Sequence, residues 1–382
     1  MASHRRGARC ASMAALAGVL LVGAAWAQQF QPEQAGVVPA ITAKNRVYML
    51  DIAINHIADG KLHIVDGDSL RYLGLIGTGF AGQTILSLDG REIIVATGYL
   101  SRGQRGERAD IVEVWDADTL EFKYEIPIPD KRAMAINYEG LVRLSSMGRW
   151  LYVQNATPAT SVTVVDMEAR RALGEISMPG CYGIYPSRAY PNRFASLCGD
   201  GTIATVNLDE SGNVASRASS QKLFDPDEDA WFVSGEQVGD TYYFLSFKGN
   251  LIAVNVASDA AAVTGSWSLL TGADMKKKWR PGGYQPLAIQ RNRIYVAMHP
   301  GGAEGSHKNP AAEIWVFDLT TKKRIARMKG SNAIALEVSA DGSKLYAIDP
   351  VKSSLVVYDH PGPKPKIRTV QVGETAVQLV TP

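Results

Sequence analysis

The chain of 382 residues contains little cysteine, little charge and none of the common catalytic signatures. It has three cysteines, and charged residues make up 20% of it, so neither a dense disulfide framework nor a highly charged disordered chain is indicated. No CxxCH, Walker, HExxH or GxSxG motif occurs. The sequence therefore offers no evidence for c-type haem, nucleoside triphosphate, zinc-protease or serine-hydrolase chemistry.

The first 27 residues form a segment of their own. Three arginines precede residues 13–25, which are all apolar or glycine, and Ala25 and Ala27 supply small residues where a signal peptidase needs them. This pattern predicts a secretory signal peptide over residues 1–27, cleaved after Ala27. The alternative is an uncleaved N-terminal anchor, although the apolar run is too short to span a bilayer.

Loss of the signal peptide would change the charge balance. The whole chain has 40 Lys and Arg against 38 Asp and Glu, and the signal segment contains three arginines and no acid. The mature chain would carry 37 basic residues against 38 acidic ones, and no long apolar run follows residue 27. This balance predicts no nucleic-acid partner and no membrane association.

Two cysteines remain after the signal peptide, Cys181 and Cys198. In an exported protein such a pair predicts a disulfide bond, which would stabilise the fold by about 3 kcal/mol. The alternative is a redox-active pair, but such pairs usually have CxxC spacing.

Short β-branched runs that end in Asp or Asn recur along the chain at intervals of 41 to 63 residues. Each is followed by a polar turn and another strand-like piece, and several are preceded by a turn and strand. Four short strands in each 40 to 50 residues are typical of a β-propeller blade. We predict an all-β, seven-bladed β-propeller. The seven runs end at or near Asp66, Asp116, Asp166, Asp209, Asn255, Asp318 and Asp359.

The spacing of these runs also predicts how the chain is divided. Residues 45–382 contain no linker, so they should form one propeller domain, with residues 28–44 as an extended N-terminal arm. The stretch NRVYMLD, which starts at Asn45, should help to close the ring. The longest interval, from Asn255 to Asp318, predicts an insertion or long loops around residues 270–310.

Two motifs that suggest ligand sites have better structural explanations. GTGFAG at residues 77–82 is close to a dinucleotide fingerprint, but a strand-like stretch follows it where a helix is required. Asp225, Asp227, Asp229 and Glu236 have the spacing of a calcium loop, but Ala230 occupies the position that needs glycine. We interpret residues 225–236 as a solvated acidic loop and predict no metal site.

The segment GYLSRGQRGERADIVEVWD, residues 98–116, places Arg102, Arg105 and Arg108 near Glu107 on a long connection between two strands. It lacks the interleaved aromatic residues that stack on bases. Two interpretations remain open. The arginines contact a partner subunit, or they pair with carboxylates that fix the loop.

Several stretches together resemble the heavy subunit of the tryptophan tryptophylquinone amine dehydrogenases, with more likeness to the aromatic (aralkyl) amine branch than to the methylamine branch. The likeness runs from about residue 45 to the C-terminus. The stretches that carry it are RGQRGERADIVEVWDADTLEFKYEI (102–126), RAMAINYEGLVR (132–143), LYVQNATPATSVTVVD (151–166), GCYGIYP (180–186), CGDG (198–201), WRPGGYQ (279–285) and MHPGGAEGSHKNPAAEIWVFD (298–318).

The resemblance implies a seven-bladed propeller in a periplasmic heterotetramer of two heavy and two light chains. The tryptophan tryptophylquinone cofactor would lie in the light subunit, so this chain would hold no cofactor and no catalytic residue. The complex would oxidise primary amines to aldehyde and ammonia. Electrons would pass singly to a blue-copper protein such as azurin or amicyanin.

The resemblance also implies a role for Phe80. In the family a phenylalanine after a glycine-rich turn lines the substrate channel, and GTGFAGQ is the matching stretch. The alternative is an ordinary core phenylalanine. Three other functions remain possible for the whole chain: the heavy subunit of a methylamine dehydrogenase, a non-enzymatic propeller binding protein, or a metal-dependent propeller hydrolase.

Overall fold

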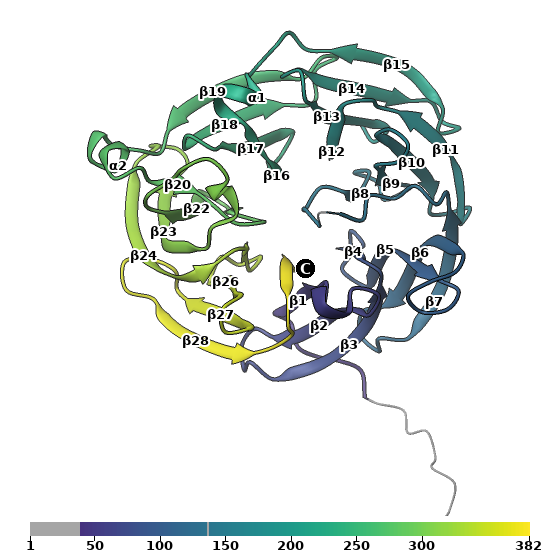
Figure 1. Ribbon diagram of the computed structural model, residues 1–382, viewed down its shortest axis with the longest axis horizontal. Helices are drawn as coiled ribbons and strands as arrows, with labels where there is room; N and C mark the ends of the chain where they lie inside the picture. The colour runs from purple at the N-terminus through teal and green to yellow at the C-terminus, as the bar shows by residue number, and fades with distance from the viewer. Residues whose placement is uncertain (1–38, 136) are drawn as a thin grey trace, which may run out of the picture. The chain divides into compact units, whose positions relative to one another are not determined.

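The structure is a computed structural model, and it describes residues 39–135 and 137–382. The predicted signal peptide (1–27) and residues 28–38 of the predicted arm lie outside the described residues. Residues 39–382 form one compact unit. Seven antiparallel sheets are arranged radially around a central axis in this unit (Figure 1). The prediction of a seven-bladed β-propeller is confirmed.

Each blade has four main strands, and the innermost strand lies beside the axis. The strands of the first four blades, each from the axis outward, are β29 (Ala376–Val380), β1 (Arg46–Asp51), β2 (Gly60–Asp66), β3 (Tyr72–Gly79); β4 (Gln83–Leu86), β5 (Glu92–Leu100), β6 (Arg108–Asp116), β7 (Phe122–Ile128); β8 (Val142–Leu144), β9 (Trp150–Asn155), β10 (Ser161–Asp166), β11 (Arg171–Ser177); and β12 (Cys181–Pro186), β13 (Arg193–Cys198), β14 (Ile203–Leu208), β15 (Val214–Ser219).

The remaining three blades follow the same order, except that the sixth has two short inner strands. Their strands are β16 (Trp231–Val238), β17 (Thr241–Ser246), β18 (Asn250–Asn255), β19 (Ala262–Ser268); β20 (Arg280–Pro281) and β21 (Leu287–Gln290), both paired with β22 (Arg293–His299), then β23 (Ala311–Asp318), β24 (Arg324–Ala333); and β25 (Leu336–Val338), β26 (Lys344–Asp349), β27 (Ser354–Asp359), β28 (Lys366–Gln371).

The ring is closed by the two ends of the chain. The last strand, β29, pairs with β1 in one sheet, with Leu50 opposite Gln378. This pairing confirms the expectation that the stretch at residue 45 helps to close the ring. Closure removes the open sheet edges that an incomplete ring would expose.

The recurring Asp or Asn of the sequence ends or directly follows the third strand of each blade, where the chain turns into the outermost strand. In the second blade, Asp116 Oδ1 accepts hydrogen bonds from the N–H groups of Asp118 (2.9 Å) and Thr119 (2.8 Å). Asn255 makes the same turn in the fifth blade with the N–H groups of Ala257 and Ser258. A short polar side chain that bonds the backbone two residues ahead stabilises such a turn, which explains the repeat.

The core lies between neighbouring sheets. Trp150 and Tyr152 of the third blade are buried against Phe194 and Val206 of the fourth, and the Tyr152 and Phe194 ring centroids are 4.8 Å apart. Because each blade has apolar side chains on both faces, only stacking against neighbouring blades buries them.

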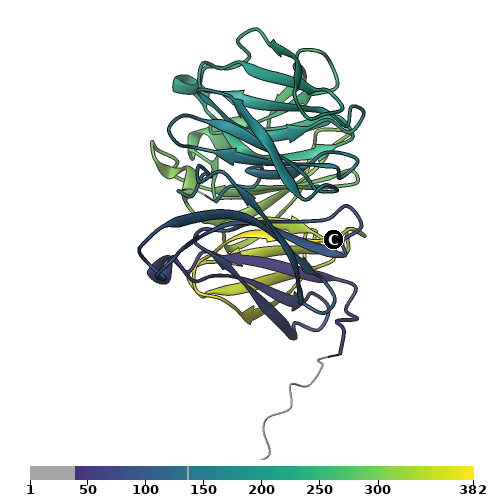
Figure 2. The same ribbon diagram turned by 90° about the vertical axis from the view of Figure 1, so that its right-hand side faces the viewer.

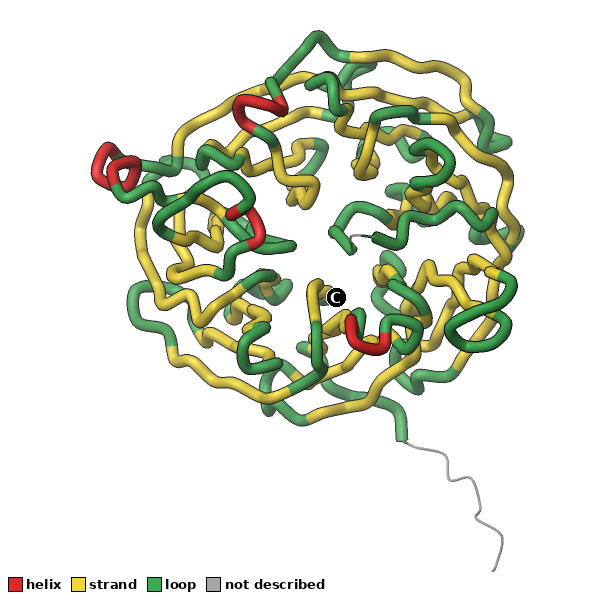
Figure 3. Tube along the Cα trace, viewed as in Figure 1, coloured by secondary structure: helices red, strands yellow, loops and turns green. Residues whose placement is uncertain are grey.

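Successive connections alternate between the two faces of the ring. We call the face that carries the second-to-third-strand and blade-to-blade connections the loop face, and the opposite face the turn face. The short helices all lie in loop-face connections within the described part of the chain (Figure 3). They are η1 (Ile54–His56), α1 (Pro226–Asp229), α2 (Gly272–Lys276) and η2 (Ser306–Lys308). The C-terminus lies on the turn face (Figure 2).

The predicted insertion around residues 270–310 is present. It contains α2, the extra strand β20 and η2. Across the residues described, no helix has the length and apolarity needed to cross a membrane.

Candidate functional site

Phe80 lies on the loop face, in the three-residue connection between β3 and β4. The connection is sharply bent, because Gly79 and Ala81 have positive φ values of 54° and 47°. A Cβ atom at Gly79 would come within 2.5 Å of Thr97 Oγ1, so the turn requires glycine there. The Phe80 N–H donates to the Gly98 carbonyl oxygen at 3.0 Å, which fixes the turn against β5.

The half-buried Phe80 side chain borders an apolar hollow of about 80 Å³. Tyr99 and Leu100 of β5 and Met134 of the connection between β7 and β8 line the same hollow. The sequence-predicted channel residue therefore lies beside apolar side chains from two blades rather than within the core of one sheet.

A buried arginine donates hydrogen bonds to the backbone of this turn. The Arg132 side chain donates from one terminal nitrogen to the Ala81 carbonyl (2.8 Å) and from the other to the Phe80 carbonyl (2.7 Å). Arg132 is 1% exposed. Burial lowers the pKa of its guanidinium to about 10, although nearby Asp110 opposes that shift. The backbone N–H of Arg132 donates to Asp110 Oδ2 at 3.0 Å.

Arg108 completes this group. Its Nε donates to Asp110 Oδ1 at 2.8 Å, and a terminal nitrogen forms an ion pair with Asp110 Oδ2 and donates to the Arg132 carbonyl at 3.1 Å. We call Arg108, Asp110 and Arg132 the Phe80 clamp. Arg108 therefore follows the second interpretation of the basic segment, in which an arginine pairs with a carboxylate.

Arg102 and Arg105 differ from Arg108. Both are exposed near the tip of the loop 101–107, where the Arg102 N–H donates to the Arg105 carbonyl. Neither forms an ion pair within the described part of the chain. Their contact with a partner subunit, and that of Arg108, stays a prediction.

A second, larger hollow of about 340 Å³ opens on the loop face. Its lining is mainly aromatic and apolar and also includes Glu304 and His307. The principal residues are Tyr138, Trp231, Phe232, Val233 and Phe247. Burial, and then neighbouring Lys308, lower the pKa of His307, which favours the neutral ring. The stretch 298–318, singled out in the sequence, thus contributes to this aromatic hollow.

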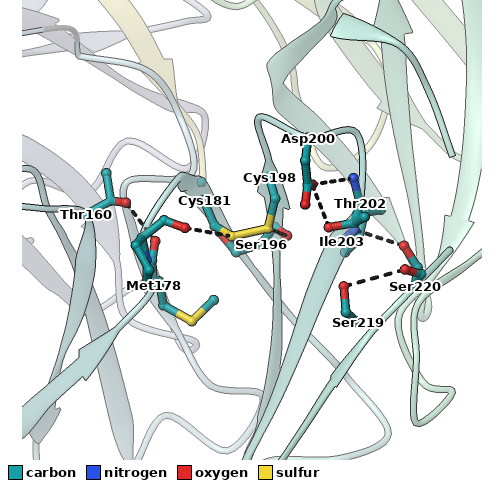
Figure 4. The surroundings of a disulfide bond; sticks show 12 residues. Thr160, Met178, Cys181, Ser196, Cys198, Asp200, Thr202, Ile203, Ser219 and Ser220 are labelled. Atoms are coloured by element: carbon teal, nitrogen blue, oxygen red, sulfur yellow. Dashed lines mark hydrogen bonds between the residues drawn. A yellow bond between two sulfur atoms is a disulfide. The ribbon is translucent and has the colours of Figure 1, made fainter. Parts of the chain in front are cut away.

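The predicted disulfide between Cys181 and Cys198 is present (Figure 4). The two residues lie directly opposite each other in β12 and β13, with Cα atoms 3.9 Å apart. The bond lies beside the loop-face connections, where the Gly199 N–H also donates to the Gly180 carbonyl. The disulfide joins the loop-face ends of β12 and β13 in the fourth blade.

A cluster of charged residues surrounds the axis nearer the turn face. Glu139, Arg143 and Glu337 line a cavity of about 460 Å³, and Glu139 forms an ion pair with Arg143. Burial, and then repulsion by Glu139, raise the pKa of Glu337 to about 8. The same two causes raise the pKa of Glu236.

No group of three or more His, Cys, Asp or Glu residues in the described ranges is arranged to hold a metal ion. The interpretation of residues 225–236 as a solvated loop is correct only in part, because the stretch contains α1 and the start of β16, where burial raises the pKa of Glu236. The Asp225 side chain accepts from the Asp227 N–H, and Asp229 accepts from the Lys248 N–H at 2.7 Å. His63 contacts Asp51 and Tyr72, while His56 is exposed in η1.

Comparison with known proteins decides the family. The sequence profile of the methylamine dehydrogenase heavy chain family matches residues 43–381. This chain belongs to that family. Methylamine dehydrogenase heavy chains from Methylobacillus flagellatus and Paracoccus versutus are 29% and 28% identical to it. The two alignments cover 82% and 84% of this chain and 79% and 75% of the respective relatives.

Solved structures agree on the fold. The periplasmic gluconolactonase of Pseudomonas aeruginosa superposes with a TM-score of 0.60 at 12% identity, covering 88% of this chain and 98% of that one. Dihydro-haem d1 dehydrogenase superposes with a TM-score of 0.55 at 16% identity, covering 91% of this chain and 77% of that one. At such identities the likeness shows a propeller and carries no conclusion about activity.

The sequence predicted the disulfide, and the family resemblance singled out Phe80, whose channel role stays a prediction, but neither indicated the contacts of Arg132 and Asp110. Both residues lie in stretches that carry the family resemblance, yet no spacing connects them. Arg132 is 52 residues from Phe80 and 22 from Asp110. Only the folded ring brings these three residues together.

Proposed function

We propose that this chain is the heavy subunit of a periplasmic aralkylamine dehydrogenase. It would assemble with a light subunit that bears tryptophan tryptophylquinone, as two heavy and two light chains. The complex would convert primary aromatic amines to aldehyde and ammonia and pass electrons to a blue-copper protein such as azurin or amicyanin. Membership of the methylamine dehydrogenase heavy chain family supports the coarser part of this proposal.

One structural observation carries the proposal for the site: the bent Phe80 turn, held by a buried arginine, beside an apolar hollow on the loop face. The quinone of the partner would supply the oxidation chemistry. Phe80, Tyr99 and Met134 would form one wall of the passage to it, where apolar side chains exclude water and select the amine by its shape.

The signal-peptide pattern of residues 1–27 supports export to the periplasm. The aromatic hollow offers the light chain a concave apolar surface on the same face as Phe80. Arg102 and Arg105, exposed on that face, are candidate partner contacts.

A methylamine dehydrogenase heavy subunit is the second candidate. Its support is the printed name of the curated relatives, which are all methylamine dehydrogenase heavy chains at 26–29% identity. The sequence stretches that resemble the aralkylamine branch support the first candidate.

Purification from the native host tests the proposal. We expect a small chain with quinone absorbance to accompany this protein, and the complex to turn over phenylethylamine and tyramine with a higher kcat/KM than methylamine. A higher kcat/KM for methylamine would favour the second candidate. Purification of this chain alone, with no quinone-bearing partner, would contradict both and indicate a binding propeller. If this polypeptide oxidised amines without a partner, the assignment of the chemistry to the light subunit would be wrong.

A further inference from the structure

The Phe80 turn is held by side chains from a different blade connection. Its three carbonyl oxygens, of Phe80, Ala81 and Gly82, all accept hydrogen bonds from side chains. Arg132 donates to the first two, and Asn137 Nδ2 donates to the third at 2.6 Å. Such a connection would ordinarily expose its carbonyl groups to water, so this degree of support from buried side chains requires an explanation.

The support uses a buried charge. Burial of an arginine is unfavourable unless carboxylate and hydrogen-bond partners compensate for the lost hydration. Here the guanidinium donates to carbonyl oxygens, and the negative charge of nearby Asp110, which is 2% exposed, favours its charged form. Asp110 itself accepts hydrogen bonds from Arg108 and from the Arg132 backbone. Asp110 also links the turn to the connection after β7, because its own N–H donates to Asp130 Oδ1 at 2.8 Å.

The geometry fixes the backbone from which the Phe80 ring projects. Its backbone is fixed on one side by Gly98 and on the other by Arg132, and the flanking residues Gly79 and Ala81 have left-handed conformations that few alternatives can replace. The Cα–Cβ bond of Phe80 therefore has a fixed starting direction, and its half-buried ring borders the apolar hollow.

We propose that Arg132, held by Asp110 and Arg108, is a positioning residue that fixes the Phe80 ring and thereby sets how sharply the enzyme discriminates between amines of different size. This inference rests on the function proposed above. Arg132 acts through Phe80 and does not itself need to contact the amine.

The test uses the purified heavy–light complex with Arg132→Lys. Lysine keeps the charge, but its single ammonium group cannot donate to both carbonyls in the way that the forked guanidinium does. We expect the ratio of kcat/KM for phenylethylamine to that for methylamine to move toward one by roughly tenfold, because a small misplacement of a positioning group has a large effect. Because the reacting groups would belong to the partner, the change should appear mainly in KM, whereas a loss of active complex alone would lower the apparent kcat for both amines equally.

A double-mutant cycle separates positioning from general stability. In a Phe80→Ala background, Arg132→Lys should no longer alter the amine ratio, because the ring that it positions is absent. The matched control is Arg368→Lys, which alters a comparable arginine–carboxylate pair with Asp359 in the outermost strand of the seventh blade. That control should leave the ratio unchanged.

The possible outcomes are distinct. An unchanged ratio in Arg132→Lys, or an equal change with and without Phe80, overturns the positioning role. A change that Arg368→Lys reproduces also overturns it, since the effect would then follow from any loss of stability. If no quinone-bearing chain is present in the purified wild type, the proposed function fails, and this outcome is visible before any variant is made.

Discussion

The loop face and the turn face of the ring are ends of the same strands, but different contacts hold them. On the turn face, the Asp or Asn at the end of a third strand typically accepts from backbone N–H groups two or three residues ahead, as Asp116 and Asn255 do, although Arg368 also reaches the Asp68 carbonyl across 300 residues. On the loop face, Arg132 reaches Phe80 across 52 residues and Asp51 reaches Thr375 across 324. Repetition of short-range turns specifies a fold, whereas unique long-range contacts specify a site.

The largest expected effect comes from the disulfide, which is the covalent tie of the loop face. Replacing both Cys181 and Cys198 with serine removes a crosslink between residues 17 positions apart. We expect the free energy of unfolding to fall by about 3 kcal/mol, because the unfolded chain regains the entropy of the open loop. Denaturant unfolding of the oxidised wild type and the double variant measures this difference.

Both cysteines are changed together so that no free thiol remains to form other disulfides. A loss close to zero would mean that the bond does not constrain the unfolded chain, and the loop face would then need no covalent support.

The second prediction compares one substitution on the two faces. Asp51 Oδ1 accepts from the N–H groups of Ala53 (2.8 Å) and Thr375 (2.9 Å), and Oδ2 accepts from the Glu374 N–H. In Asp51→Asn the new amide would place its own N–H groups against a backbone donor. We expect a loss of about 2 kcal/mol, because a buried donor is left without an acceptor.

Asp116→Asn is the matched turn-face control. Its turn uses only Oδ1, and Asn255 already makes the same turn in the fifth blade. We expect a loss within about 0.5 kcal/mol. Equal losses at Asp51 and Asp116 would contradict the contrast between the faces.

The difference at Asp51 should also depend on pH. Burial would raise its pKa, but hydrogen bonds from His63 and from three backbone N–H groups lower it from 3.8 to about 2. A depressed folded-state pKa stabilises the fold above the unfolded value, and this contribution is lost as the pH falls. The stability difference between wild type and Asp51→Asn should therefore shrink as the pH falls from 3.8 to about 2.

These contrasts explain what could be predicted from sequence. The Asp and Asn turns recur because each has a local physical cause. The sequence pattern therefore predicts the number of blades, the closed ring and the insertion before Asp318. The positive φ at Ala81, the burial of Arg132 and the aromatic hollow depend on residues from different blades. No periodicity or spacing reports such contacts, and only the family resemblance indicated Phe80.

The third prediction concerns amine binding. It tests whether residues of the loop face, and not those of the turn face, determine the KM for the amine. Phe80→Ala removes the ring at the hollow, and we expect the KM for phenylethylamine to rise roughly tenfold through lost apolar contact, with kcat little changed. Steady-state kinetics of the heavy–light complex give both constants.

Leu88→Ala is the control, because Leu88 is an exposed apolar residue of the turn face, 62% accessible to solvent. Its KM should equal that of the wild type. An unchanged KM in Phe80→Ala would return Phe80 to the role of an ordinary packing residue.

The smallest expected effect lies on the axis near the turn face. The pKa of Glu337 is raised from 4.5 to about 8 by burial and then by repulsion from Glu139, with Arg143 and Gln285 as its opposing partners and Glu236 also buried close by. A carboxyl whose folded-state pKa is raised favours folding while it is protonated, so this contribution is lost as the pH rises from 4.5 to about 8. The stabilising contribution of Asp51 on the loop face is therefore lost as the pH falls, whereas that of Glu337 near the axis is lost as the pH rises.

Glu337→Gln should flatten the alkaline side of the stability profile, because the amide cannot ionise. We expect the variant to gain stability relative to the wild type as the pH rises from 4.5 to about 8, because the wild-type carboxyl ionises over this range and the amide does not. Glu121→Gln, at an exposed turn-face carboxyl, should leave the slope as it is. If Glu337→Gln also leaves the slope unchanged, burial and repulsion by Glu139 do not raise the pKa of Glu337, and the prediction is wrong.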